Sequence, residues 1–328
     1  MSKNNKEKRP QNKEVIDTYL KHYDHSEDSK SMRRSSLKYF FGEKRSEKSF
    51  GYNEHIFDID VSTLLDYFNW LKNLDIVSIQ TRRNKWNILT SFLKYTMIYY
   101  NSQKDKDKRN KYEEFIVIIP TSQFTHWRNA IPKAGEVKTN AKVYATKREI
   151  EKVLLYFKAV NFGHYLIFRV FTDTGMRKGE LIEATISDLN ISERYFYTKK
   201  GKTGEKIYVF KEDLVKLLKI YLNERNKLNI TSNILFLSKH LNKYSPRGFN
   251  LILKYACNKL KIEKNITTKT LRKTLNDYRK QMGCSLEDRE RLVGHKNSKV
   301  NIKNYTKFDI ADLTKTYDRW YPYEDLNI

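Results

Sequence analysis

Cysteine is scarce in this chain of 328 residues, which contains only Cys257 and Cys284. Their separation fits no zinc-ligand spacing, and two cysteines form no framework of several disulfides. Long apolar runs are absent too: a membrane-spanning helix needs about 18 or more consecutive apolar residues, and no stretch of the chain comes near that length. The sequence therefore predicts neither a disulfide-rich domain nor a membrane protein.

The first 15 residues are polar and basic, without the apolar core of a secretory signal peptide. We therefore expect a protein that is not secreted and acts in the cytoplasm, either beside a prokaryotic nucleoid or in the host cell of a virus or mobile element. The sequence also offers no carboxylate cluster that would hold a catalytic metal, so we expect neither a metal nor another cofactor.

Acidic residues are too few to balance the basic ones. The chain has 64 Lys and Arg against 39 Asp and Glu, which gives a net charge of +25. Such a charge points to a polyanionic partner; nucleic acid is the leading candidate, and a membrane surface is the rival. Hydrophobic residues make up 39% of the chain and aromatic residues 13%, which is too rich for a disordered protein. The length suffices for two domains, each with its own core.

Helical spacing of apolar residues dominates the first half of the chain. Residues 1–12 are polar and basic after Met1 and are predicted to form a flexible basic arm. A helical domain is predicted over residues 13–132, with its clearest helices at 29–41, 59–73 and 78–100. Two of these helices carry basic side chains that could line a phosphate backbone, although solvated surface is the alternative for each one alone: Arg33, Arg34, Arg82, Arg83 and Lys85.

Residues 133–145 are basic and of low complexity, and they are predicted to link this domain to a second one. The second domain is predicted over residues 146–308. It opens with a capping box, Thr146-x-x-Glu149, followed by apolar residues at helical spacing. An apolar helix follows, ending at Thr174.

Two short motifs come next along the chain. The run Thr174-Gly175-Met176-Arg177-Lys178-Gly179-Glu180-Leu181 ends one helix with glycine and starts another with Arg177, where a helix N-terminus favours anions. Taken alone, Arg177 and Glu180 are better explained as an ordinary ion pair at a helix start. Further on, two β-prone runs, 189–198 and 206–210, flank Lys199-Lys200-Gly201-Lys202-Thr203-Gly204-Glu205, which predicts a β-hairpin.

The stretch from Thr268 to Phe308 carries the richest chemistry. Thr268 is predicted to cap a helix that bears Lys269, Arg272 and Lys273. Positions three apart share a helix face, so Lys269 and Arg272 can meet one phosphate.

A second helix in this stretch, with Ser285 as its predicted cap, leads into Leu292-Val293-Gly294-His295. Tyr305 lies ten residues beyond His295. Arginine binds phosphate through two hydrogen bonds, histidine or lysine can move a proton, and a phenol can attack phosphorus. The combination indicates phosphoryl transfer through a tyrosine.

The order and spacing of these motifs resemble the signature of the tyrosine recombinase, or phage integrase, family. That signature comprises Thr-Gly-x-Arg-x-x-Glu-Leu, a hairpin lysine in Lys-Thr-Gly, then His-x-x-Arg, Leu-Gly-His and the nucleophilic tyrosine. The resemblance implies that Tyr305 is the nucleophile, and that Arg177, Arg272 and His295 stabilise charge on the phosphate. It makes Lys202 the general acid, with Lys200 as the alternative.

The resemblance also assigns supporting residues. Glu180 would orient Arg177 from behind. Lys269 stands where most members have histidine, and Lys273 where histidine is frequent. Archaeal viral integrases and type IB topoisomerases tolerate a lysine at the first of these positions. Because a lysine with an ordinary pKa near 10.4 accepts protons poorly at neutral pH, the group that takes the Tyr305 proton stays open.

The implied fold is mainly α with a small β-sheet or hairpin, in two domains that clamp duplex DNA: a helical core-binding domain and a mixed α/β catalytic domain. The implied function is site-specific DNA recombination through a 3′-phosphotyrosine, without ATP or metal, by a homotetramer on DNA. Residues 309–328, with Asp309 as the predicted cap, would pack on a neighbouring subunit or in cis. The alternatives are a type IB topoisomerase-like enzyme and a DNA-binding regulator that has lost catalysis.

Overall fold

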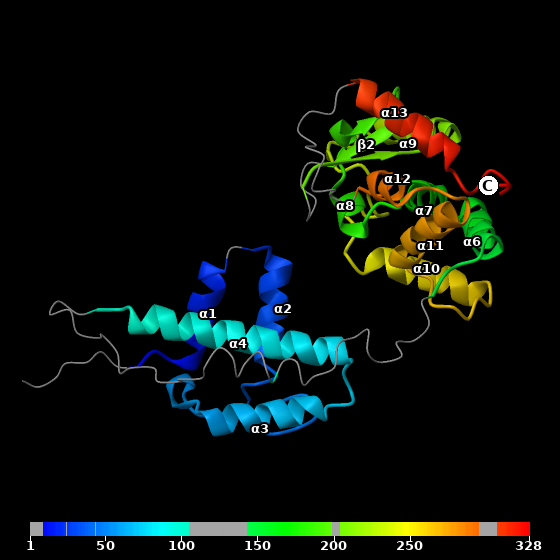
Figure 1. Ribbon diagram of the computed structural model, residues 1–328. Coiled ribbons are helices and arrows are strands. Elements are labelled where there is room, and N and C mark those ends of the chain that lie inside the picture. Colours follow the sequence, from blue (N-terminus) through cyan, green and yellow to red (C-terminus); the bar gives the residue numbers. More distant parts are fainter. Residues whose placement is uncertain are drawn as a thin grey trace, which may run out of the picture. The chain divides into compact units, whose positions relative to one another are not determined.

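The computed structural model describes residues 9–23, 25–42, 44–104, 127, 143–198, 204–294 and 307–328. The chain divides into two compact units, Met1–Ala141 and Lys142–Ile328 (Figure 1). This division falls within residues 133–145, where the sequence predicts the linker.

Among the described residues, the first unit contains the helices α1 (Asn12–His22), α2 (Glu27–Leu37), α3 (Val61–Lys72) and α4 (Ile79–Asn101), with a 3-10 turn η1 (Ile56–Asp58) before α3. Figure 1 shows α1 and α2 on one side of α4 and α3 along the other. Asp60 and Ser78 accept hydrogen bonds from backbone amides and so cap α3 and α4. The helices predicted over 59–73 and 78–100 are confirmed.

The second helix ends earlier than predicted, at Leu37 rather than Phe41. Residues after Leu37 leave the helix because their backbone pairs with a later segment. The Phe50 amide donates to the Tyr39 carbonyl at 2.6 Å, and the Tyr52 amide donates to the Phe40 carbonyl at 3.0 Å. Long-range pairing therefore replaces the last helical turn.

Aromatic side chains form the core of the first unit. Trp86 on α4 is fully buried, and Tyr67 on α3 stacks on it with ring centroids 6.2 Å apart. Phe40 meets Tyr67 edge to face at 5.0 Å. Trp127, which lies outside these helices, stacks on Phe68 at 6.0 Å. Residues from both sides of the 105–126 segment thus share one core.

The helices of the second unit are α6 (Lys147–Val160), α7 (Phe162–Thr174), α8 (Lys178–Glu183), α9 (Glu212–Lys227), α10 (Gly248–Lys259), α11 (Thr268–Gln281), α12 (Leu286–Leu292) and α13 (Lys307–Arg319), with a 3-10 turn η2 (Ile186–Asp188). Helix α7 is central: every residue from Tyr165 to Thr174 is buried, and α6, α9 and α11 pack around it. The predicted capping box is confirmed, since Thr146 and Glu149 exchange hydrogen bonds at the start of α6.

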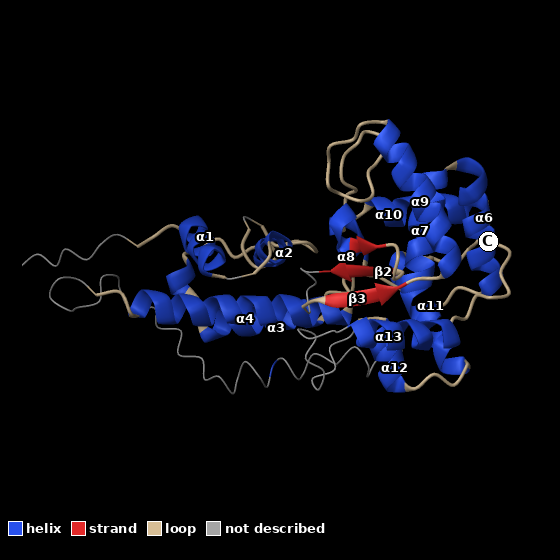
Figure 2. Ribbon diagram, turned by 90° about the horizontal axis from the view of Figure 1, so that it is seen from above, coloured by secondary structure: helices blue, strands red, loops and turns tan. Residues whose placement is uncertain are grey.

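The sheet of the second unit has the antiparallel order β1 (Leu189–Asn190), β2 (Tyr195–Thr198) and β3 (Lys206–Val209) (Figure 2). The hairpin predicted between the two β-prone runs is confirmed as β2 and β3, with Thr198 opposite Lys206. The first run splits into two strands because the chain turns within it, at Arg194 with a φ of 57°. Residues Lys206 and Tyr208 point to the same face of the sheet, since side chains alternate along a strand.

The C-terminal segment packs against its own unit, Lys142–Ile328. Helix α13 begins at Lys307, so Asp309 lies inside the helix and not at the predicted cap position. Leu313, Tyr317, Tyr321 and Tyr323 are buried in the same core as α7. Packing of this segment on a neighbouring subunit stays a prediction.

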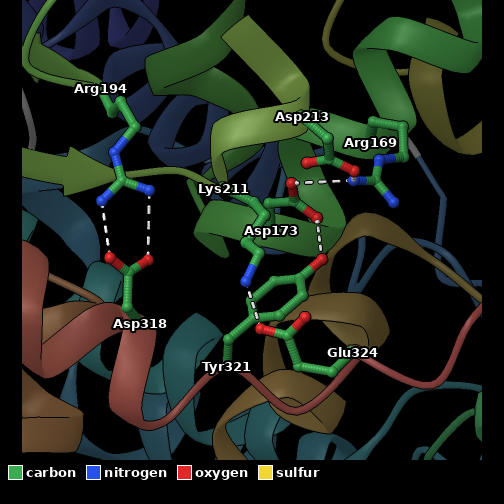
Figure 3. A network of polar contacts seen from close by, with 8 residues as sticks. All are labelled: Arg169, Asp173, Arg194, Lys211, Asp213, Asp318, Tyr321 and Glu324. Atoms are coloured by element: carbon green, nitrogen blue, oxygen red, sulfur yellow. Dashed lines mark hydrogen bonds and ion pairs between the residues drawn. The ribbon is translucent and has the colours of Figure 1, made fainter.

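Polar contacts fix this segment to three parts of its own domain (Figure 3). The Asp318 carboxylate pairs with Arg194 at 2.6 Å, and Glu324 pairs with Lys211. The Tyr321 hydroxyl donates to Asp173 of α7 at 2.9 Å. Because Asp173 is fully buried, this last contact brings the tail into the centre of the domain.

Within the described ranges, no helix is both long enough and apolar enough to cross a membrane.

Candidate active site

The end of α7 and the start of α8 place Arg177. Gly175 ends α7 with a φ of +63°, a left-handed conformation that glycine adopts without strain. A Cβ on Gly175 would meet the Leu275 side chain at 3.1 Å and the Arg272 side chain at 3.6 Å. The glycine therefore lets α11 approach the chain just before Arg177. The Arg177 side chain is 34% exposed and is accessible to a ligand.

Glu180 holds Arg177 from one turn into α8. Its Oε1 accepts a hydrogen bond from Arg177 Nη1 at 3.1 Å, and its Oε2 accepts one from the Arg177 amide at 3.0 Å. The carboxylate side chain is only 6% exposed. The contact that the sequence predicts between these two residues is present, and the carboxylate lies beneath the arginine.

Strand β3 supplies two further partners of Glu180. The Lys206 ammonium forms an ion pair with Oε1, and the Tyr208 hydroxyl donates to Oε2 at 2.7 Å. Both side chains are buried. Sequence analysis missed these two residues. The available signal was their i, i+2 spacing in a predicted strand, which sets a lysine and a tyrosine on one face.

Arg272 on α11 joins this group from the opposite side. Its Nη1 donates to the Gly175 carbonyl, and its Nη2 donates to the Val293 carbonyl at 2.6 Å. Arg272 also lies close enough to Tyr208 and Glu180 to interact with them electrostatically. Arg272 therefore ties the end of α7 to the turn after α12, beside the residues that hold Glu180.

The electrostatics of this pocket favour a bound anion. Burial by itself raises the pKa of Glu180, but hydrogen bonds from Lys206, Tyr208 and the Arg177 amide outweigh it and hold that pKa below its usual value. Burial lowers the pKa of Lys206, as do the neighbouring charges of Arg177 and Arg272, against the opposing effect of Glu180. Among the described residues, three cationic side chains therefore surround one carboxylate. The positive excess suits a phosphate group.

The other predicted residues of α11 lie on its surface. The cap of this helix is Thr267, one residue earlier than predicted, because its side chain accepts the Thr270 amide. Lys269 and Lys273 are both exposed. Lys269 lies one turn before Arg272, as the spacing requires.

A family model described as "Phage integrase family" matches residues 144–311, which is more than half of the chain. The chain belongs to the phage integrase family.

Individual curated relatives match this chain over part of their own length. The tyrosine recombinase XerA of Saccharolobus solfataricus is 28% identical over 205 residues, which cover 61% of this chain and 65% of the relative. The tyrosine recombinase XerD of Staphylococcus haemolyticus is 24% identical over 159 residues, which cover 48% of this chain and 54% of the relative. The chain thus spans roughly half to two thirds of the length of these curated relatives.

Solved structures share the fold at low identity. The Tn1549 transposon integrase in complex with transposon right end DNA aligns with a TM-score of 0.61 and 16% identity, over 91% of this chain and 96% of that chain. A lambda integrase dimer bound to a COC′ core site aligns with a TM-score of 0.58 and 16% identity, over 92% and 76%. These alignments and the mainly helical structure with its small sheet confirm the predicted fold class.

Several residues that the phage integrase resemblance makes important lie outside the described residues: Lys200, Lys202, His295 and Tyr305. The other tyrosines near the C-terminus have structural positions. The Tyr278 hydroxyl accepts the Lys147 amide at 3.0 Å, and Tyr317, Tyr321 and Tyr323 are buried. Tyr305 stays the predicted nucleophile.

No candidate metal centre accompanies this pocket in the part of the chain that the structure describes. There, no three His, Cys, Asp or Glu side chains gather closely enough to hold an ion.

The basic residues predicted to bind DNA in the first unit have different surroundings. Lys85 is only 5% exposed, and its ammonium lies 2.9 Å from the centroid of the Tyr39 ring. Its burial does not fit the predicted phosphate contact. Lys85, Ile88 and Phe92 stand at i, i+3 and i+7, so Lys85 shares the core-facing side of α4.

The predicted arginines of the first unit differ in their exposure. Arg82 bonds the Val77 carbonyl and pairs with Asp75, and the Arg33 guanidinium stacks 3.8 Å from the centroid of the Tyr23 ring. These two contacts lie within their own domain. Arg33, Arg82 and Arg83 are partly buried, whereas Arg34, which pairs with Asp17, is 51% exposed. Arg34 is therefore the most accessible of the four for the predicted contact with DNA.

Proposed function

We propose that the protein is a site-specific DNA recombinase that cleaves and rejoins strands through a 3′-phosphotyrosine intermediate. The observation that carries this proposal is the cluster in which Glu180 holds Arg177 while Arg272 lies close enough to both to interact with their charges. Such a pair can bind the two non-bridging oxygens of one phosphodiester. Membership of the phage integrase family supports the same chemistry.

In the proposed reaction, the Tyr305 oxygen attacks the phosphorus of a phosphodiester bound by Arg177 and Arg272, and the phenolic proton passes to a base of the site. The bond to the 5′-oxygen breaks, Lys202 or Lys200 protonates that oxygen, and the phosphate stays attached to the tyrosine. His295 donates a hydrogen bond to a non-bridging oxygen, on which negative charge develops. A 5′-hydroxyl then attacks the phosphotyrosine and restores the backbone. Because the bond energy is retained in the intermediate, rejoining needs no ATP.

A nicked suicide substrate tests this proposal directly, since loss of a short fragment after cleavage traps the covalent protein–DNA adduct. The wild-type protein should form the adduct, Tyr305→Phe should bind DNA without forming it, and Tyr278→Phe should form it. An adduct with Tyr305→Phe would refute the assignment of the nucleophile. Supercoil relaxation without recombinant product would favour the topoisomerase-like alternative, and binding without any adduct would favour a regulator.

We propose that the partner is duplex DNA, held by both units, and that the active form is a homotetramer. The net charge of +25 supports DNA as the partner, as do the DNA complexes named for the solved relatives. Affinity for DNA should fall steeply as the salt concentration rises. In a plot of the logarithm of the binding constant against the logarithm of the salt concentration, each neutralised phosphate should add about 0.9 to the downward slope. A fragment of residues 146–328 should bind more weakly than the full chain, and equal affinities would exclude the two-unit clamp.

A further inference from the structure

We propose that Lys206 is a positioning residue for the phosphate pocket, and that it acts at both ends of its side chain. Its ammonium fixes Glu180 and thereby Arg177, and its aliphatic stem supports the Gly294 backbone that leads to His295. The proposal rests on the proposed strand-cleavage function for its kinetic consequences. It also makes a structural prediction that can be measured without cleavage.

The ammonium end completes the set of donors around Glu180. Oε2 receives the Arg177 amide and the Tyr208 hydroxyl, and Oε1 receives Arg177 Nη1 and Lys206. Without Lys206, the only side chain left on Oε1 among these contacts would be Arg177 itself. The Tyr208 hydroxyl on Oε2 would then be the one remaining contact of the carboxylate with strand β3 among these, so the carboxylate could follow the guanidinium more freely as it moves.

The stem of Lys206 lies against a backbone position with no room for a side chain. Gly294 has a φ of +61°, and a Cβ built on it would lie 2.7 Å from the Lys206 Cδ and 3.2 Å from its Cβ and Cγ. The preceding residue, Val293, provides the carbonyl that binds Arg272. The stem is therefore the surface on which the turn carrying this acceptor rests, one residue before His295.

Lys206 cannot itself be the proton donor in this arrangement. Its side chain is 0% exposed, and Glu180 occupies its ammonium. A general acid has to come within hydrogen-bond reach of the leaving oxygen. Lys206 therefore acts through its neighbours, and the proton donor is left to the lysines of the hairpin tip.

A purely structural role is the competing explanation, because a buried ion pair can serve folding alone. Buried ion pairs contribute little net stability on average, since desolvation offsets the attraction. If Lys206 only stabilises the fold, activity should decline in proportion to stability. If it positions Arg177, activity should fall much further than stability explains.

The kinetic test compares Lys206→Met with variants matched for stability. Val153→Ala on α6 and Leu218→Ala on α9 each remove buried methyl groups, and the one whose melting temperature matches that of Lys206→Met is the control. Single-turnover adduct formation is measured well below both melting temperatures. We expect Lys206→Met to be about 100-fold slower than wild type, as for a displaced reacting group, and the matched variant to stay within about twofold. Equal losses in the two would overturn the proposal.

A second lysine variant controls for charge. Lys211 pairs with Glu324 just beyond β3, so Lys211→Met also removes a lysine–glutamate pair from this domain. Because that pair is partly exposed, the rate of adduct formation by Lys211→Met should remain within about twofold of the wild-type rate.

The pH profile gives a readout that a purely structural role would not move. Glu180 faces Arg177, Lys206 and Tyr208, and Arg272 lies beyond Tyr208. Removal of the Lys206 hydrogen bond raises the pKa of Glu180. Protonation of the carboxylate would then release Arg177 at a higher pH. The acidic midpoint in the pH dependence of the adduct-formation rate should therefore lie at a higher pH in Lys206→Met than in wild type. An unchanged midpoint would contradict the proposed role of the Lys206 ammonium.

Hydrogen exchange separates this proposal from the proposed function. The Arg177 amide donates to Glu180 Oε2, so its exchange should accelerate in Lys206→Met and remain slow in Lys211→Met. Unchanged protection in Lys206→Met would refute positioning, whether or not DNA is cleaved. If the wild-type protein forms no adduct on any DNA while the amide accelerates as expected, the proposed function fails and the structural role of Lys206 stands.

Discussion

Removal of the Tyr208 hydroxyl should loosen the pocket while leaving its shape intact. Phenylalanine fills the same buried volume but loses the hydrogen bond to Glu180 and the electrostatic interaction of the phenol oxygen with Arg272. A hydrogen bond to a charged group contributes about 1.5–3 kcal/mol. Glu180 keeps Arg177 and Lys206, and Arg272 keeps two carbonyls, so neither charge becomes unpaired. We therefore expect Tyr208→Phe to lower the free energy of unfolding by about 2 kcal/mol, the contribution of one such bond.

Single-turnover adduct formation measures how much of this loss reaches the reaction. If all of it is expressed in the transition state, about 2 kcal/mol corresponds to a rate about 30-fold lower. Affinity for DNA should change little, because most contacts to DNA are made elsewhere along the backbone. Tyr317→Phe is the matched control, since the structure gives the buried Tyr317 hydroxyl no hydrogen-bond partner among the described residues. A Tyr208→Phe protein with the stability and rate of wild type would refute the link between the two arginines.

Three further predictions concern other parts of the catalytic unit. Gly294→Ala should lower the free energy of unfolding in urea by at least about 1–2 kcal/mol, because Gly294 has a left-handed φ and lies against the Lys206 stem. Gly179→Ala on α8 is the control, since a Cβ there meets open space and should not lower the stability. Equal stabilities of the two variants would contradict the prediction. Burial raises the pKa of Asp173 to about 6 despite the nearby charge of Arg169. A carboxyl group that holds its proton more tightly in the folded state stabilises the fold most at low pH, so the free energy of unfolding of wild type relative to Asp173→Asn should fall by up to about 3 kcal/mol as pH rises from about 4 to 8. A difference that does not change with pH would show that Asp173 does not titrate in this range. Lys269→Ala should slow adduct formation while Lys269→His retains much of it, and a histidine variant as inactive as alanine would mean a different arrangement of the site.

Local signals in the sequence located most of the helices and both described arginines of the site. Capping at Thr146 and Ser285 was correct because a cap depends on residues within one turn. Arg177 and Glu180 were found as a pair because they are three residues apart on one helix start. Features set within a few residues of each other were therefore predictable.

Features set by distant contacts were not predictable from the sequence. Alternation along β3 puts Lys206 and Tyr208 on one face, but only the packing of the sheet decides that this face meets Glu180, which precedes Lys206 by 26 residues. The placement of the tail depends on contacts such as Arg194 with Asp318, which lie 124 residues apart. Lys85 is the opposite case, since its spacing with Ile88 and Phe92 already indicated the core-facing side of α4.

The excess positive charge of the cluster fits the proposed catalysis as well as the proposed binding of a phosphate. A phosphodiester carries one negative charge, and the phosphorane-like transition state of its cleavage carries more. Arg177, Arg272 and Lys206 share the single carboxylate of Glu180, so their mutual repulsion is relieved partly by the substrate and further by the transition state. Interactions that strengthen between these two states lower the barrier, whereas equal binding of both would not. A second carboxylate in the pocket would remove this difference, which is why one buried glutamate that orients the arginines without neutralising them fits the proposed chemistry.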